Sequence, residues 1–366
     1  MQIPPLKVHF SESDRAEIEQ RIDRCLATGQ VAQGPNLDEF EESFAHYTRS
    51  PFALALSNGG SAIEVSMWAL NVKGKEVLVP TNTFIATASG IVLAGGRVKL
   101  VDCAPGQSCP GLAEIQQAAG PETAGVVLVH IGGMICPEIK EICEWCAERG
   151  LWVFEDCAHA HGAELDGRAA GTFGVAGAYS FFSTKVITSG EGGMLITADE
   201  SLGSKVRLFR NYGKPDPWIT YSVQFGGNWR LNELAAAVGV VHLKRLDEFI
   251  SWRQRIASLY STLLSNIDGL TPIQPAGRSS WYKYIVLLSK GIVRDKFKAA
   301  MKERGVSPAG GVYDLPLHRQ PVLEAAARCS FPSADDFCAR HLCLPLYYGM
   351  TEPEAEYVVS VVKSLL

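Results

Sequence analysis

No stretch of this sequence reaches the roughly 18 consecutive apolar residues that a membrane-spanning helix needs. Its first residues, MQIPP, also lack the basic segment followed by an apolar stretch that marks a signal peptide. We therefore expect a cytoplasmic protein that neither crosses a membrane nor uses one as a partner.

Runs of basic residues are missing as well. The 34 Lys and Arg residues are outnumbered by 39 Asp and Glu residues, which gives a formal net charge of −5 and a pI near 5.9. Nucleic-acid binding depends on clustered cations, so we expect no nucleic acid among the partners. Internal repeats and low-complexity stretches are absent too.

The ten cysteines form no recognisable disulfide or metal framework. Most stand in apolar surroundings, and only Cys143 and Cys146 form a C-x-x-C pair, inside a helical pattern and without a second pair. We interpret the thiols as packed side chains in a reducing compartment. A zinc or redox site at the C-x-x-C pair is the alternative.

What the sequence does contain is an alternation of short apolar runs and helical patterns. The apolar runs are continuous and often rich in Val, which is typical of strands buried on both faces. They occur at 52–56, 76–79, 98–101, 125–129, 152–154, 178–182 and 193–196, and helical patterns fall at 62–70, 84–94, 112–119 and 137–149. This βαβ rhythm predicts an α/β fold with a large, mainly parallel seven-stranded sheet.

Helical patterns also stand on either side of this region. One helix should begin at the start signal SESD (11–14) and end near residue 28. A long helical stretch runs from 232 to about 267, followed by a strand-like run at 282–288 and helices at 293–304 and 352–365. We expect an N-terminal arm and a large domain in residues 1–250, and a small C-terminal α/β domain in residues 251–366.

Three segments of the βαβ region contain residues suited to ligand binding or catalysis. The first is the turn SNGGSA (57–62), which joins an apolar strand to a helix and exposes backbone N–H groups that suit a phosphate. The turn matches neither G-x-G-x-x-G nor G-x-x-x-x-G-K-[ST], so neither a dinucleotide nor a nucleoside triphosphate is indicated. A plain tight turn remains the alternative.

The second place is EDCAHAHG (155–162), where a strand ends in Asp156. An aspartate at this sheet edge can keep a pyridinium nitrogen protonated. A helix cap is one alternative and a metal site with His159 and His161 is another, although their spacing matches no known zinc pattern.

The third place is the segment SFFSTK (180–185), followed by SGEGG (189–193). A partly desolvated lysine beyond an apolar strand can lose its proton near neutral pH and form a Schiff base. Ser180, earlier in the same segment, could point its hydroxyl at a phosphate. Lys185 could instead merely cap a loop.

The order of these places along the chain resembles the fold-type-I pyridoxal-phosphate (PLP) enzymes, and in particular the nucleotide-sugar aminotransferases of the DegT–DnrJ–StrS family. Further similar segments extend the resemblance over nearly the whole chain: Gly34-Pro35, Phe40-Glu41, VPTNTF (79–84), RNYG (210–213), GNWRL (227–231) and LPLH (315–318).

The resemblance implies roles for the central residues. Lys185 would form the Schiff base with PLP and shuttle protons, and Asp156 would pair with the pyridine nitrogen. Phe84 would stack on the ring, unless it is a core aromatic. His159 stands where relatives often have Gln and would contact the phenolic oxygen, adding a group that can change charge near physiological pH.

The resemblance also implies how the phosphate is held. Gly60, Ser61 and Ser180 would contact it, although relatives usually carry Thr at the position of Gly60. Asn228 corresponds to a residue that reaches the phosphate of the neighbouring subunit, which implies a homodimer with shared active sites. A turn asparagine is the alternative at this position.

The implied activity is the transfer of an amino group from an amino acid, glutamate in the family, to a nucleotide-linked keto-sugar, as in amino-sugar biosynthesis for polysaccharides or antibiotics. The cofactor would alternate between PLP and its pyridoxamine form (PMP), and no metal is expected. Arg230 and Arg210 are equal candidates for binding the donor carboxylate. The alternatives are a PLP-dependent sugar dehydratase or deoxygenase, in which histidine replaces the lysine, and a non-catalytic PLP-binding regulator. The sequence does not identify the sugar, its carbon, the nucleotide or the pathway.

Overall fold

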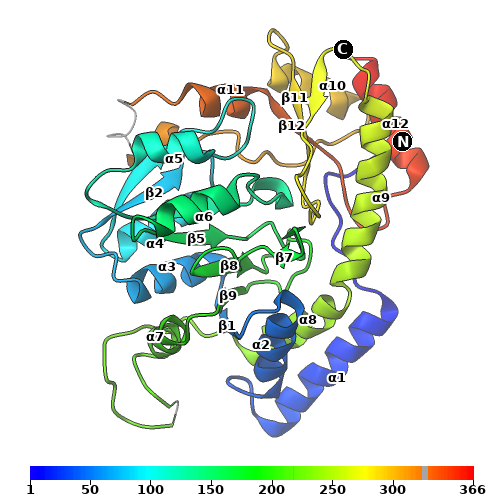
Figure 1. The fold of residues 1–366 in the computed structure, drawn as a ribbon. Coiled ribbons are helices and arrows are strands. Elements are labelled where there is room, and N and C mark those ends of the chain that lie inside the picture. Colours follow the sequence, from blue (N-terminus) through cyan, green and yellow to red (C-terminus); the bar gives the residue numbers. More distant parts are fainter. Residues whose placement is uncertain (217, 324–328) are drawn as a thin grey trace.

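The structure is a computed structural model that describes residues 1–216, 218–323 and 329–366. A large sheet with helices on both faces forms most of the molecule, and a smaller sheet with its own helices lies beside it (Figure 1). Of the described helices, none is long and apolar enough to cross a bilayer.

The large sheet contains seven strands in the order β1-β9-β8-β5-β4-β2-β3. Strand β9 runs antiparallel to both of its neighbours, whereas the other pairs are parallel. The strands are β1 (Phe52–Leu56), β2 (Glu76–Pro80), β3 (Arg97–Val101), β4 (Thr123–Val129), β5 (Trp152–Asp156), β8 (Ala176–Ser180) and β9 (Gly193–Thr197). The predicted fold class is thus confirmed.

One predicted strand lies two residues earlier than expected. The run at 178–182 corresponds to β8, which ends at Ser180. The chain turns there because the Phe182 carbonyl accepts a hydrogen bond from the Lys185 N–H at 2.9 Å, so Phe182 belongs to the turn.

Alternate residues of the strands face two separate cores, as expected for a sheet covered on both sides. Val127 and Val129 pack with α3 (Gly59–Ala69), α4 (Ile85–Leu93) and α7 (Glu200–Arg210). Val126 and Leu128 pack with helices of the opposite face, which are α2 (Pro35–Thr48), α5 (Leu112–Ala118), α6 (Ile139–Ala147) and α8 (Glu233–Lys244).

Helix α2 follows α1 (Glu12–Thr28) and was not predicted as a helix. Its first N–H groups are bound by a residue nearly 200 positions later: the buried Glu233 carboxylate accepts from the Gly34, Asn36 and Leu37 amides, each at 2.9 Å. A carboxylate at a helix N-terminus satisfies orphan donors and complements the helix dipole.

The long helical stretch predicted from 232 to 267 is two helices. Helix α8 ends and α9 (Leu246–Leu264) begins at Arg245, whose side chain donates to the carboxylates of Asp14, in α1, and Glu248. Leu246 of α9 belongs to the core of the large sheet, whereas residues from Ile256 onward belong to the C-terminal core. The proposed domain boundary at residue 250 falls within this helix.

The C-terminal part is built on a three-stranded antiparallel sheet, β10-β11-β12. Its elements are β10 (Leu270–Pro272), β11 (Tyr284–Leu288), α10 (Arg294–Glu303), α11 (Pro332–Arg340), β12 (His341–Leu344) and α12 (Glu352–Lys363). The N-terminal segment joins it, because Ile3 pairs with Val306. Short elements complete the chain: the 3-10 turns Ile131–Gly133 and Leu317–Arg319, and the hairpin of β6 (Glu164–Leu165) and β7 (Arg168–Ala169).

Candidate active site

A cavity of about 650 Å³ lies at the carboxyl ends of β5 and β8, beside the start of α3. This is the edge at which open α/β sheets bind ligands. The C-terminal part closes the cavity with residues 282–283 and 310–313. Most of the predicted site residues line it: Gly60, Phe84, Asp156, His159, Ser180 and Lys185.

The start of α3 forms one wall. Asn58 caps the helix by accepting from the Ser61 N–H at 2.8 Å, and Ser61 Oγ accepts from the Asn58 N–H at 3.1 Å. Gly59 and Gly60 occupy the first helical positions, whose N–H groups have no carbonyl partner within the helix. Ser61 itself is buried, with its hydroxyl engaged in this cap, and does not line the cavity.

Asp156 is the last residue of β5 and is 5% exposed. Its Oδ2 accepts from Thr87 Oγ1 at 2.8 Å, and its Oδ1 accepts from the Ala158 N–H at 3.1 Å. Both carboxylate oxygens are therefore fixed in position, which prepares the group to hold a cationic partner.

Lys185 follows β8 in a turn, and its Nζ lies 5.0 Å from the centroid of the Tyr282 ring. Burial lowers the pKa of this ammonium from 10.5 to about 8, with Asp156 opposing the shift and Lys283 adding to it. The amine is thus partly unprotonated near neutral pH, as a nucleophile requires.

Phe84 caps the N-terminus of α4 and is 56% exposed. Its ring borders the cavity and lies 5.9 Å from the Tyr313 ring. Phe84 is therefore not a core aromatic, and its ring is available to a flat ligand.

The His159 ring stacks on Tyr282 at 4.3 Å, accepts from the Gly132 N–H through Nδ1, and lies 3.2 Å from the Tyr313 hydroxyl through Nε2. Burial lowers the pKa of His159 well below its ordinary value, and the nearby Lys185 and Lys283 lower it further. The expectation that this ring titrates near physiological pH is therefore wrong.

His161 does not join Asp156 and His159 in a metal site. It is buried between the Tyr179 and Phe181 rings. The residues that the structure describes contain one other group with metal-ligand atoms, made of His130, Glu155 and Cys157.

Hydrogen bonds, rather than a metal, account for the proximity of Glu155 and His130 in that group. The buried Glu155 carboxylate accepts from three backbone N–H groups, those of Gly171, Phe173 and Gly174, and lies 2.9 Å from His130 Nε2.

The cysteines are free thiols, in keeping with the interpretation of packed side chains. Burial raises the pKa of Cys143 to about 12 and that of Cys146 to about 11. A raised pKa does not suit a reactive thiolate, and neither thiol belongs to a group of metal-ligand atoms among the described residues.

The two arginine candidates differ in their surroundings, and neither lines the cavity. Arg210 is buried and donates to the Glu41 carboxylate and to the Ala55 carbonyl. Arg230 donates to Asn211 Oδ1 at 2.6 Å. Asn228 is exposed and also lies outside the cavity of its own chain, where it pairs with Asn211 at the end of α7.

Sequence reasoning missed the side chains that the C-terminal part contributes. Tyr282 and Lys283 precede β11, and Tyr313 follows a glycine pair more than 120 residues after Lys185. A polar pair in front of an apolar strand was the available signal, but no local pattern relates it to β5 or β8.

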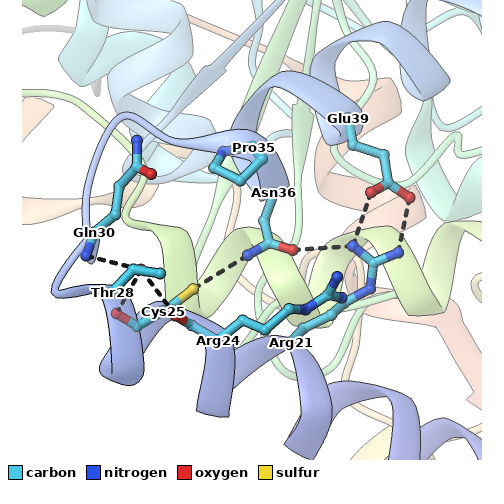
Figure 2. Close-up of a pocket in the computed structure, with 8 residues that line it drawn as sticks. All are labelled: Arg21, Arg24, Cys25, Thr28, Gln30, Pro35, Asn36 and Glu39. Atoms are coloured by element: carbon cyan, nitrogen blue, oxygen red, sulfur yellow. Dashed lines mark hydrogen bonds and ion pairs between the residues drawn. The ribbon is translucent and has the colours of Figure 1, made fainter.

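A second hollow, of about 290 Å³, lies between α1 and α2 (Figure 2). The Arg21 guanidinium there donates to both oxygens of Glu39 at 2.8 Å and to Asn36 Oδ1 at 2.9 Å. Arg21 in α1 and Glu39 in α2 therefore neutralise each other's charge across this hollow.

Comparison with known proteins agrees with this geometry. Residues 12–363 match the DegT/DnrJ/EryC1/StrS aminotransferase family. The dTDP-4-dehydro-2,3,6-trideoxy-D-glucose 4-aminotransferase of Saccharopolyspora spinosa is 34% identical, over 92% of this chain and 91% of that protein. GDP-perosamine synthase of Caulobacter vibrioides is 31% identical, over 93% of each chain.

Among solved structures, the aminotransferase TlmJ of Streptoalloteichus hindustanus superposes with a TM-score of 0.91 at 31% identity, covering 100% of this chain and 99% of that one. The predicted resemblance, enzyme class and cofactor are confirmed at the level of the family, whose members depend on PLP. The chain described here belongs to the DegT/DnrJ/EryC1/StrS family of aminotransferases.

Proposed function

We propose that the protein transfers an amino group from glutamate to the keto group of a nucleotide-linked sugar, with PLP held on Lys185. One observation carries this proposal: Lys185 and Asp156, which must both touch one cofactor, line the same cavity. The two relatives named for dTDP- and GDP-linked chemistry support a nucleotide-sugar substrate and leave the nucleotide open.

The residues present fit the phosphate of PLP. The first N–H groups of α3 face the cavity from the positions of Gly59 and Gly60, where a helix N-terminus favours an anion. Ser180, at the end of β8, adds a hydroxyl. Since the Ser61 hydroxyl is engaged in the helix cap, we assign Ser61 to positioning this turn.

The residues present also fit the pyridine ring of PLP. The Asp156 carboxylate, oriented by Thr87, would hold a proton on the pyridine nitrogen, and Phe84 would cover a ring face. Nδ1 of neutral His159 accepts from the Gly132 N–H, so its one donor is Nε2–H, which faces the Tyr313 hydroxyl and would turn to the phenolic oxygen when PLP binds. Bound PLP supplies an electron sink for the electrons of a broken bond next to the transferred nitrogen.

Lys185 would act twice. Its Nζ would first hold the aldehyde carbon of the cofactor, and the arriving amine of the donor would release it. The free Nζ, with its lowered pKa, would then accept a proton from the donor α-carbon and later return a proton to the sugar carbon. The presence of this lysine disfavours the dehydratase or deoxygenase alternative.

We further propose a homodimer in which Asn228 of one chain completes the site of the other. Asn228 is exposed and cannot serve the cavity of its own chain. Its loop also exposes Trp218 and Phe225, at 84% and 93%, and exposed aromatic side chains of this kind are typical of interfaces.

We also propose that the protein acts in the cytoplasm, because its cysteines are free thiols, as is usual in a reducing compartment.

The experiment combines donor chemistry with trapping. Glutamate added to the PLP-loaded protein should change the absorbance of the cofactor and release 2-oxoglutarate. Borohydride should attach the cofactor covalently to the wild-type chain and not to Lys185→Ala. An unchanged spectrum with every amino acid would instead favour the non-catalytic regulator, and trapping in Lys185→Ala would remove Lys185 from its role.

A further inference from the structure

The cavity contains a second amine that the proposed reaction has not used. Of the described residues that line it, Lys185 and Lys283 carry amines and Asp156 and Glu191 carry carboxylates. When PLP occupies Lys185 and Asp156, as the proposed function requires, Lys283 is left as the basic group of the cavity.

A backbone hydrogen bond to the large sheet's side of the cavity fixes the position of Lys283. Its N–H donates to the Gly132 carbonyl at 3.1 Å. The residue is 8% exposed, and its Nζ lies 4.8 Å from the centroid of the Tyr282 ring. Within the described part of the chain, no carboxylate lies within 4.0 Å of this Nζ. Burying an ammonium without an anionic partner is unfavourable, and burial accordingly lowers the pKa of Lys283.

The location of Lys283 indicates which anion it would meet. Lys185 Nζ and Lys283 Nζ approach the same ring, at 5.0 and 4.8 Å from its centroid, so they cannot be further apart than the sum of these distances. The donor amine must take the place of Lys185 on the cofactor, and the donor α-carboxylate is attached to the same carbon as that amine. The phosphates of a nucleotide-sugar, by contrast, are separated from the reacting carbon by the sugar ring. The donor α-carboxylate is therefore the anion that comes nearest to Lys283.

Other cations are already engaged. Arg210 is bound to Glu41 and to the Ala55 carbonyl, and Arg230 is bound to Asn211 outside the cavity. Arg253 donates to the carbonyls of Trp281 and Leu346 through Nη1, and although its Nε has no partner among the described residues, it does not line this cavity.

We propose that Lys283 binds the α-carboxylate of the amino donor through a charge-assisted hydrogen bond. Lys283 is thus a specificity residue for an amino acid over a simple amine, contributed by the C-terminal part to a reaction centre on the large sheet. The proposal rests on the proposed function, because it assumes PLP on Lys185.

The test compares two donors in single-turnover reactions of the PLP-loaded protein, followed through the cofactor absorbance. Glutamate carries the α-carboxylate and 4-aminobutyrate lacks it. We expect Lys283→Met to weaken glutamate binding by about 10- to 100-fold, the range of a lost charge-assisted hydrogen bond, and to leave 4-aminobutyrate binding unchanged. The limiting rate should change much less than the affinity.

Two further variants separate a binding role from a structural one. Lys283→Arg keeps the charge and should recover most of the preference for glutamate. Lys302→Met removes an exposed lysine of α10 from the same C-terminal part and should behave as wild type. Cofactor absorbance and thermal unfolding confirm that each variant is folded and loaded.

Each remaining outcome has one meaning. Equal losses for both donors, or a loss confined to the keto-sugar half-reaction, would overturn the assignment of Lys283 while the proposed function stands. Wild-type protein that reacts with no amino donor would refute the proposed function itself, and the inference with it.

Discussion

The amine of Lys185 combines two opposing influences, removal from water and a nearby carboxylate. Removal from water is the larger, so the pKa falls to about 8 although Asp156 raises it. Below that pH the amine is protonated and cannot attack an aldehyde, and above it the neutral amine dominates. An ordinary lysine needs a pH near 10.5 for the same change.

This shift predicts the pH dependence of cofactor capture. In apoprotein mixed with PLP and cyanoborohydride, the rate of covalent attachment should rise through a midpoint near pH 8 and then level off. The Lys185→Ala variant should lack this phase. A midpoint near the ordinary lysine value would show that the amine is solvated rather than buried.

Some residues that line the cavity can be predicted from the sequence and others cannot, and the difference has a physical reason. Asp156 and Ser180 end the adjacent parallel strands β5 and β8, and Lys185 follows β8 in a turn. The carboxyl ends of parallel strands share an edge of the sheet, so these residues come together there. Tyr282 and Lys283 reach the same cavity from another sheet, and only tertiary packing relates the two. The neutral state of His159 likewise depends on burial, which the sequence does not show.

Among the elements, the contact between α3 and β8 sets the position of the turn at residues 58–61, which starts α3. An added Cβ at Gly59 would lie 2.8 Å from Ser180 Cβ and 3.2 Å from Ser180 Cα. Neither atom belongs to a flexible side-chain tip, so the helix start would have to move away from the strand end. Glycine is required here by close approach, since Gly59 does not have a positive φ.

We therefore expect Gly59→Ala to lower the free energy of unfolding by about 1–3 kcal/mol, the usual effect of overpacking, and to weaken PLP binding. Equilibrium denaturation and PLP titration measure the two effects. Gly203→Ala is the matched control, because the nearest atom to its added Cβ is 3.7 Å away within α7. Equal stability of the two variants would contradict the close contact.

Strands and most helices follow from their apolar patterns, but the ends and breaks depend on distant residues. Helix α2 escaped prediction because Glu233, far along the chain, binds its first N–H groups. The break at Arg245 likewise involves Asp14 of α1, so periodicity alone suggested one continuous helix.

For the whole molecule, the exposed loop that carries Asn228 predicts complementation between chains. Lys185→Ala and Asn228→Ala homodimers should each be impaired, since every site needs both residues. Random exchange of subunits should recover about a quarter of the wild-type activity, because half of the dimers are mixed and each mixed dimer has one intact site. Activity measured before and after mixed refolding tests this.

Recovery no greater than the average of the two parents would place Lys185 and Asn228 of a single chain in the same site. Wild-type protein that sediments as a monomer would exclude the shared arrangement altogether.

The walls of the cavity are far apart in the order of synthesis. Asp156 and Lys185 leave the ribosome long before Tyr282, Lys283 and Tyr313. A nascent chain that stops before β11 contains Lys185 without the C-terminal side chains that line the cavity beside it. The surroundings that lower the pKa of Lys185 therefore form only after residues 282–313 have been synthesised.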